Sequence, residues 1–239
     1  MKAIILAAGQ GIRLGNGLSE LPKCLLKIGN KTIIEKQLES LSSAGIEEIS
    51  IVVGAKGECW TQESFDMINH LCENIVINFD NSITCNTVSA YLALRGCQKD
   101  DIMILDGDVV YERKLLNKIL SSSYENIIVA KIAESRKEIG CRLIKTHSSD
   151  DKLKNIGKNI IGIDFPWYIH SGIFKVGINS FEYFFKKLSD NKFFNEELDA
   201  PLREFIENDE IYILSTPAEE WVNINTQQDL KKAVELFSK

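Results

Sequence analysis

The chain has 239 residues, of which 44% are hydrophobic and 26% charged, proportions close to those of ordinary globular proteins. This length and composition exclude a disordered or fibrous chain and fit one compact domain with a sizeable core. With 34 acidic and 28 basic side chains the formal charge is −6, which argues against general affinity for nucleic acid or anionic membranes.

The sequence gives no sign of export or membrane insertion. The first residues, MKAIILAAG, pass directly into glycines and charges, without the apolar core and cleavage site of a signal peptide. No apolar run approaches the roughly 18 residues needed to cross a membrane. The six cysteines stand singly, without a CxxC pair or zinc-like spacing with histidine, as is typical of reduced thiols. We therefore expect a cytoplasmic protein.

The first half of the chain alternates short apolar runs with helical periodicity, the pattern of βαβ units on a parallel sheet. Apolar runs predict four strands, at residues 2–7, 49–53, 74–78 and 101–105. Apolar residues at helical spacing predict a helix in each interval, through Ile34–Leu41, Phe65–Cys72 and Val88–Arg95. Gly45 stands where the first of these helices would be capped at its C-terminus.

From about residue 126 the pattern changes to strand-like runs linked by Gly, Asn and Asp turns, which predicts a mixed or antiparallel extension. The expected strands are 127–133, 141–146, 152–156, 159–165, 168–176 and 211–214. Two helices are predicted at 178–188 and 198–206, and a closing helix at 230–237 with a capping box formed by Thr226 and Asp229. No repeat or linker interrupts the chain, so we expect one α/β domain over residues 1–239, with a Rossmann-like, mixed but mostly parallel sheet flanked by helices.

The segment from Leu6 to Lys23, LAAGQGIRLGNGLSELPK, directly follows the first strand. Gly9 and Gly11 leave backbone N–H groups accessible to a phosphate, and Arg13 and Lys23 bring positive charge to the same loop. The P-loop pattern GxxxxGK[ST] and the dinucleotide pattern GxGxxG are both absent. These residues alone indicate either a cradle for a polyphosphate or a surface loop whose glycines serve as turns.

The pattern AAGxGxRL, followed about ten residues later by PK, closely resembles the signature of the nucleotidyltransferases that make nucleotide-diphospho sugars and alcohols. The resemblance implies that the Ala-Ala-Gly backbone faces the base and ribose. It also implies that Arg13 and Lys23 hold the triphosphate and act as the catalytic residues. The nucleotide-binding residues expected in this loop are Leu6, Ala7, Ala8, Gly9 and Gly11.

Asp106-Gly107-Asp108 follows the fourth strand, at the sheet edge where open α/β sheets place their ligands. A carboxylate there can hold Mg²⁺, which prefers oxygen ligands and shares its shell with substrate phosphates. The family pattern assigns the metal ligand to Asp108, while Asp106 either contacts the nucleotide or is a turn residue. The same triplet matches the DxD pattern of nucleotide-sugar glycosyltransferases, against which the AAGxGxRL…PK loop argues.

The stretch WVNINT (221–226) resembles the family's second metal-binding stretch, in which an Asp or Glu usually occupies the position of Asn223 or Asn225. Both residues are asparagines here. An amide oxygen still coordinates Mg²⁺, but without formal charge it binds the ion more weakly. The alternative is that both asparagines only end a strand and precede a helix cap, positions that suit asparagine well.

The segment NSITCNTVSAYLAL (81–94) resembles that of the compact cytidylyltransferases for phosphocholine and aminoethylphosphonate. This resemblance implies that Asn86 and Ser89 read the cytosine edge, although helix N-cap and first-turn roles are the alternative. On the acceptor side the expected contacts include a lysine for the phosphate and an anionic aromatic cage for a cationic head group. These acceptor residues are Lys158, Asp164, Trp167 and Tyr168, and the alternatives are a solvated turn position for the lysine and core packing for the aromatic rings.

We therefore expect a Mg²⁺-dependent cytidylyltransferase that joins CMP from CTP to a small phosphorylated or phosphonate acceptor and releases pyrophosphate. Residues 1–125 would bind the nucleotide and residues 126–239 the acceptor. The expected partners are these small molecules alone, without nucleic acid or membrane, in a monomer or homodimer. The alternatives are a sugar-1-phosphate uridylyl- or thymidylyltransferase and a catalytically weak nucleotide-binding regulatory protein.

Overall fold

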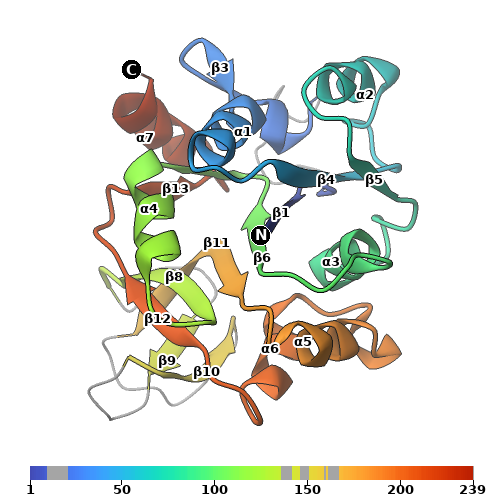
Figure 1. Cartoon of the computed structure of the whole chain (residues 1–239). Helices are drawn as coiled ribbons and strands as arrows, with labels where there is room; N and C mark the ends of the chain where they lie inside the picture. The colour runs from blue at the N-terminus through green and yellow to red at the C-terminus, as the bar shows by residue number, and fades with distance from the viewer. Residues whose placement is uncertain (10–20, 136–141, 146–150, 159, 161–166, 239) are drawn as a thin grey trace.

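The computed structural model of the chain describes residues 1–9, 21–135, 142–145, 151–158, 160 and 167–238. Its main sheet is built from β1 (Lys2–Leu6), β4 (Glu48–Gly54), β5 (Ile75–Asn78), β6 (Ile102–Asp106), β8 (Ile127–Ile132), β9 (Arg142–Lys145), β10 (Leu153–Gly157), β11 (Tyr168–Val176) and β12 (Tyr212–Ser215). The strand order is β10-β9-β11-β6-β1-β4-β5, with β8 pairing both β11 and β12 (Figure 1). Two small antiparallel sheets accompany it, β2 (Lys27–Ile28) with β3 (Lys31–Thr32) and β7 (Val109–Tyr111) with β13 (Trp221–Asn223).

Helices flank the main sheet as the sequence predicts. They are α1 (Ile33–Ser43), α2 (Gln62–Asn69), α3 (Asn86–Leu94), α4 (Arg113–Ser121), α5 (Phe181–Leu188), α6 (Asp199–Phe205) and α7 (Gln227–Phe237), with the short 3₁₀ helices η2 (Lys23–Leu25) and η3 (Asn191–Phe193). Each helix expected between the first four strands is present, so the βαβ pattern of the first half is confirmed. The helix α4 and the two small sheets lie outside the predicted elements.

The four predicted strands of the first half form a parallel sheet in the order β6-β1-β4-β5. Leu6 at the end of β1 is aligned with Val52 on one side and Asp106 on the other. Because the carboxyl ends of parallel strands meet at one edge, the loops after β1, β4 and β6 converge there.

Side-chain alternation along the strands of the main sheet produces two cores, one on each face. A third, smaller core packs α7 against the two small sheets. In β1, Ala3 and Ile5 face the core covered by α1, α2 and α4, while Ile4 and Leu6 face the core covered by α3, α5 and α6. Both faces of this strand are thus buried, which accounts for its uninterrupted apolar run. The architecture is a sheet between two layers of helices.

The antiparallel extension expected from residue 126 onward is also confirmed. The strand β11 runs antiparallel to β6, β8 and β9, while β12 runs parallel to β8. The strand expected at 159–165 lies outside the described residues except for Ile160. Since β11 pairs directly with β6, the extension continues the parallel sheet formed by the first half of the chain.

Local signals in the sequence set the ends of two helices. At the start of α1, Thr32 accepts from the Glu35 backbone and the Glu35 carboxylate accepts from the Thr32 backbone, a complete capping box. At its end Gly45 has a φ of +80°, a conformation that favours glycine, and it directly follows the cap residue Ala44. The capping box expected at Thr226 and Asp229 begins α7.

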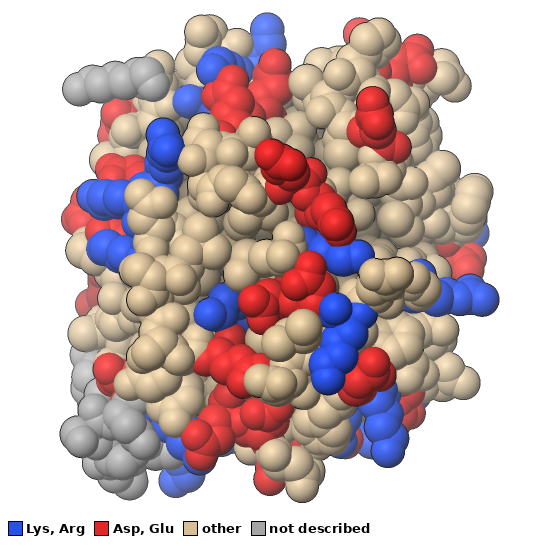
Figure 2. Space-filling view, viewed as in Figure 1, with Lys and Arg blue, Asp and Glu red and all other residues tan. Residues whose placement is uncertain are grey.

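Charged side chains of both signs and single cysteines are spread over the described part of the chain. Lys and Arg are interspersed with Asp and Glu over the face shown in Figure 2, without a continuous basic area among the described residues. None of the five cysteines in the described ranges forms a disulfide, and Cys141 lies outside them. Among the described helices, none is long and apolar enough to span a membrane.

Phe205 and Phe79 allow a matched test of the core. Phe205 is fully buried and meets the ring of Phe184 edge to face, whereas Phe79 is 66% exposed. We expect Phe205→Ala to lower the free energy of unfolding by about 3–5 kcal/mol, because it leaves a cavity. Phe79→Ala should change it by less than about 0.5 kcal/mol. Urea unfolding of both variants measures this, and equal losses would contradict the assignment of the core.

Candidate active site

A cleft of about 1360 Å³ lies where the loops after β1 and β6 meet the antiparallel part of the sheet. It is lined by the end of β1, the turn after β6, the start of α3, the middle of β11, the start of α6 and the segment from β13 into α7. Most of the described residues expected at the site line it, namely Leu6, Ala7, Ala8, Gly9, Lys23, Asn86, Ser89, Asp106, Asp108, Lys158, Asn223 and Asn225. The fold therefore brings segments from distant parts of the sequence into one cavity.

The backbone after β1 is fixed against both neighbouring strands. Ala7 donates to the carbonyl of Val52 at 2.8 Å, and Gly107 donates to the carbonyl of Leu6 at 2.8 Å. A Cβ on Gly107 would lie only 2.8 Å from Ala7, so glycine is required for this close approach. By contrast, a Cβ on Gly9 would meet no atom of the described residues within 4 Å, and Gly9 itself lines the cleft.

Asn81 joins the loops after β1 and β4. Its amide nitrogen donates to the carbonyls of Ala8, at 3.1 Å, and Lys56, at 2.7 Å. Its amide oxygen accepts from the backbone of Ala55 and Lys56. This 9% exposed side chain thus ties together backbone groups of the two loops. No motif in the sequence indicates this role for Asn81.

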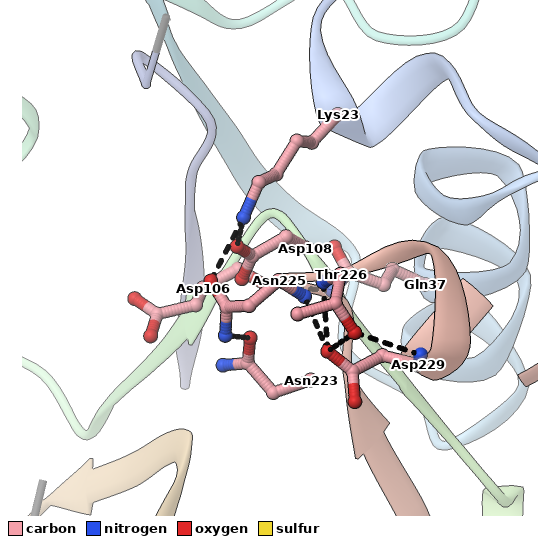
Figure 3. A network of polar contacts seen from close by, with 8 residues as sticks. All are labelled: Lys23, Gln37, Asp106, Asp108, Asn223, Asn225, Thr226 and Asp229. Carbon is pink, nitrogen blue, oxygen red and sulfur yellow. Dashed lines mark hydrogen bonds and ion pairs between the residues drawn. The ribbon is translucent and has the colours of Figure 1, made fainter. Parts of the chain in front are cut away.

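The expected metal ligands and the expected phosphate-binding lysine form one network (Figure 3). The Lys23 ammonium donates to Asp108 Oδ2 at 2.6 Å and to Asn225 Oδ1 at 3.0 Å. Asn225 Nδ2 donates to Asn223 Oδ1 at 2.7 Å. The backbone explains the meeting, because β13 pairs with β7 and Ile224 donates to the carbonyl of Asp108 at 2.8 Å.

Asp106 lies beside this network and is crowded by charge. Burial, and next the charge of Asp108, raise the pKa of Asp106 well above its ordinary value. A bulge in β11 makes room for its side chain, since Gly172 has a φ of +86° and a Cβ there would lie 2.5 Å from Asp106 Oδ2. The buried Gln37 holds the turn by donating to the carbonyls of Asp106 and Val109.

The donor set fits a hard divalent cation such as Mg²⁺. Carboxylate and amide oxygens from Asp108, Asn223 and Asn225 converge, and the cationic ammonium of Lys23 lies among them. No group of three or more His, Cys, Asp or Glu residues suited to a metal occurs in the described part of the chain. The candidate metal centre is therefore a mixed site of acid and amide oxygens.

Asn86 and Ser89 lie in the first turn of α3, where both line the cleft. The cap residue of α3 is Cys85, not Asn86, and Asn86 Oδ1 accepts from the backbone of Leu198 at 2.8 Å. The Ser89 hydroxyl accepts from the amide of the buried Asn78 at 3.1 Å. These contacts fix both side chains and link the start of α3 to the start of α6.

The other end of the cleft carries charges from the second half of the chain. Lys158 follows β10 and pairs with Glu197 at 2.7 Å. Asp199 lines the same region, where burial raises its pKa. Lys131 on β8 reaches the cleft and stacks over the ring of Trp221 at 5.8 Å. Of these residues, only Lys158 was expected from the sequence.

The aromatic cage expected around the acceptor is not formed by the residues proposed for it. Trp167 is 5% exposed and belongs to the core with Ile169, because it lies at the start of a central strand whose neighbours cover it. Tyr168 packs against the opposite core, and neither ring lines the cleft. Asp164 lies outside the described residues, as do Gly11 and Arg13.

Some of the cleft residues that were not predicted have a weak signal in the sequence. Lys131 interrupts an otherwise apolar strand, and Glu197 and Asp199 flank the first residue of the helix predicted at 198–206. Asn81 opens the segment that contains Asn86. None of these features has a spacing that separates a ligand contact from a solvated surface residue, so only the fold identifies them.

A family model described as the MobA-like NTP transferase domain matches residues 3–159, well over half of the chain. A relative from Campylobacter jejuni, named CTP:phosphoglutamine cytidylyltransferase, is 33% identical over 132 residues, which cover 54% of this chain and 52% of that protein. A relative from Methanococcus maripaludis, named bifunctional protein GlmU, is 28% identical over 214 residues, which cover 89% of this chain and 48% of that protein. The chain thus spans about half the length of these curated relatives.

Solved structures of the same fold cover the whole chain. The CTP:phosphocholine cytidylyltransferase of Streptococcus pneumoniae (LicC) matches with a TM-score of 0.78 and 24% identity, over 98% of this chain and 97% of that chain. This likeness establishes the α/β fold, including its antiparallel part.

His170, which lines the cleft from β11, predicts a dependence of stability on pH. Burial lowers its pKa to about 4, and its Nε2 atom has no hydrogen-bond partner among the described residues. In the unfolded chain His170 binds a proton below about pH 6.5, so acidification from pH 6.5 toward 4 favours unfolding.

We expect the wild type to lose about 1–2 kcal/mol more stability over this pH range than His170→Gln, in which the titrating group is removed. Urea unfolding at several pH values measures the difference. Carboxylates that titrate in both proteins cancel in the comparison. Parallel pH profiles of the two proteins would show that His170 is not held neutral by the fold.

Proposed function

We infer that this chain, which belongs to the MobA-like NTP transferase domain family, is a Mg²⁺-dependent cytidylyltransferase. It would join CMP from CTP to a small phosphorylated or phosphonate acceptor and release pyrophosphate. One observation carries the proposal: Lys23, Asp108, Asn223 and Asn225 converge in a single cleft that Ala7, Ala8 and Gly9 also line.

The proposed reaction needs positioning and charge neutralisation more than acid–base chemistry. An anionic acceptor oxygen attacks the α-phosphorus, a new P–O bond forms, and the bond to the pyrophosphate oxygen opposite it breaks. Because the nucleophile is already ionised, no general base is required. Lys23, together with Arg13, would hold the triphosphate and stabilise the departing pyrophosphate. Mg²⁺ held by Asp108 with Asn223 or Asn225 would neutralise charge on the phosphates when bound.

The choice of CTP is supported from two sides. The Campylobacter jejuni relative is named for CTP, and the first turn of α3 offers an amide and a hydroxyl, from Asn86 and Ser89, to the cleft. Both groups can donate and accept hydrogen bonds, as recognition of the O2, N3 and N4 atoms of cytosine requires. The alternative is a sugar-1-phosphate uridylyl- or thymidylyltransferase. A relative from Sulfurisphaera tokodaii, named bifunctional sugar-1-phosphate nucleotidylyltransferase/acetyltransferase and 28% identical over 77% of this chain and 42% of that protein, supports it.

We place the acceptor at the end of the cleft formed by residues 126–239, within one domain that includes the nucleotide site. Lys158 would contact the acceptor phosphate, and Glu197 and Asp199 lie near enough to the cleft to meet a cationic or hydroxyl-bearing head group. We further propose that the chain acts in the cytoplasm as a monomer or homodimer. The free thiols of the described cysteines are consistent with the proposed cytoplasmic location.

Pyrophosphate release tests the function directly. The purified chain is incubated with Mg²⁺ and, in turn, CTP, UTP, dTTP, ATP and GTP, against pools of phosphorylated alcohols and amides, phosphonates and sugar 1-phosphates. Release with CTP and a non-sugar pool is the expected result. Release only with UTP or dTTP and sugar phosphates would establish the alternative. Nucleotide binding without release from any pool would point to a regulatory protein in which the two asparagines have replaced catalytic acids.

Asp108→Asn should lower turnover at least about 100-fold, because it removes the only formal charge among the three proposed metal ligands. Asp66→Asn, on the exposed surface of α2, is the matched control and should retain wild-type turnover. Circular dichroism of both variants separates loss of chemistry from loss of fold. Turnover of Asp108→Asn within a few fold of wild type would exclude Asp108 as the metal ligand.

Lys158→Gln should raise the KM for the acceptor about tenfold while changing the KM for CTP little, because the lysine is assigned to the acceptor phosphate alone. The control is Lys154→Gln, which removes an exposed lysine from the same strand region. Steady-state kinetics with each substrate varied in turn measures both constants. A rise confined to the KM for CTP would place Lys158 at the nucleotide instead.

A further inference from the structure

Lys23 occupies the position among the candidate metal ligands that a bound cation would take. Its ammonium contacts Asp108 Oδ2 at 2.6 Å and Asn225 Oδ1 at 3.0 Å, and Asn225 holds Asn223 Oδ1 through its amide (Figure 3). The side chains of Lys23 and Asp108 are only 14% and 21% exposed, so solvent screens the pair incompletely. One lysine therefore binds two of the three candidate ligands directly, and the third is linked to it through Asn225.

This arrangement is incompatible with a metal ion on the same oxygens. Mg²⁺ binds carboxylate oxygens at about 2.0–2.1 Å, closer than the ammonium lies now, and two cations on one oxygen repel each other. The amide oxygen of Asn225 would likewise have to exchange one cation for the other. Lys23 is also the residue expected at the triphosphate, and a single ammonium cannot serve Asp108 and the phosphates fully at once.

We propose that Lys23 competes with the divalent cation for Asp108 and Asn225, and that a triphosphate opens the metal site by drawing the Lys23 ammonium onto its own oxygens. The triphosphate part of this statement rests on the proposed function, whereas the competition for Asp108 does not depend on which nucleotide is used. Binding of metal and of triphosphate is then coupled, because each removes the charge that opposes the other.

The two asparagines make a single lysine sufficient for this role. With neutral amides at positions 223 and 225, one ammonium balances the carboxylate of Asp108. The resident lysine also lowers the repulsion between Asp108 and the neighbouring Asp106. The charges of Lys23 and Asp108 therefore balance without a metal ion. A metal ion that binds without a triphosphate gains little binding free energy, because it must displace the lysine.

The competition is tested with Mn²⁺ alone, in the absence of nucleotide, by titration monitored through the electron paramagnetic resonance signal of the free ion. Lys23→Gln should bind Mn²⁺ at least about tenfold more tightly than wild type, because the metal no longer displaces a charge-assisted hydrogen-bonded pair. Lys232→Gln is the matched control, since Lys232 lines the same cleft from α7 and its removal changes the net charge equally. The gain should disappear in Lys23→Gln/Asp108→Asn.

The triphosphate part is tested with inorganic tripolyphosphate in EDTA, a probe that needs neither the correct base nor catalysis. Asp108→Asn should bind it more tightly than wild type, because the lysine is released, and this gain should vanish in the Lys23→Gln background. Failure of the proposed choice of CTP would show only in the pyrophosphate assay and would leave these measurements unaffected.

Equal Mn²⁺ affinity of wild type and Lys23→Gln, or an equal gain in Lys232→Gln, would overturn the competition. A tripolyphosphate gain that persists without Lys23 would overturn the coupling. If Lys23→Gln folds poorly, Lys23→Met replaces it, and the rise of its melting temperature with Mn²⁺ is compared with that of wild type. A rise no larger than that of wild type would count against the proposal.

Discussion

The contact between the ends of β1 and β6 is the constraint on which the candidate site depends. Gly107 donates to the carbonyl of Leu6, and no side chain fits between that glycine and Ala7. The turn that carries Asp106 and Asp108 is thereby held against the loop that would face the nucleotide. Gln37 fixes the same turn from beneath through two carbonyls. The carboxylates are thus placed by buried backbone contacts, and their position does not depend on mobile surface loops.

The second constraint is electrostatic. The cleft places Asp106, Asp108, Glu197 and Asp199 near one another, with lysines from four separate parts of the chain between them. Each half of the chain contributes charges of both signs to the cleft. Asn223 and Asn225 reduce the negative charge where most members of the resembled family would add to it. The consequence is a site whose affinity for cations is set as much by Lys23 as by the ligands themselves.

Sequence patterns predicted the long elements well and the short ones poorly. The four parallel strands carry buried apolar runs on both faces, and the helices between them carry complete apolar stripes, so periodicity alone located them. The strands β7 and β13 have three residues each, too few to show a period, yet their pairing is what brings Asn223 to Asp108. The loop signature located the glycine-rich segment, whereas Lys131, Asp199 and Asn81 required the three-dimensional arrangement. The sequence placed Trp167 in a cage around the acceptor, because an indole ring suits both an aromatic cage and a hydrophobic core. Only the burial of its side chain in the structure distinguishes the two.

The irregularity in β11 divides that strand into two parts, and both parts pair with β8, whereas β9 pairs only with the first part and β6 only with the second. Before Gly172, Tyr168 and Ile169 pair with β8 and β9, and after it, Ile173 to Val176 pair with β6. The residues that surround the proposed acceptor end are therefore anchored to the part of β11 before the bulge. The strand β6, which carries Asp106, is anchored to the part after it. Sequence changes in β9, β10 and the start of α6 can accumulate without shifting the ladder that holds the carboxylates. A fold divided at this point can acquire new acceptors over evolutionary time while its nucleotide chemistry stays the same.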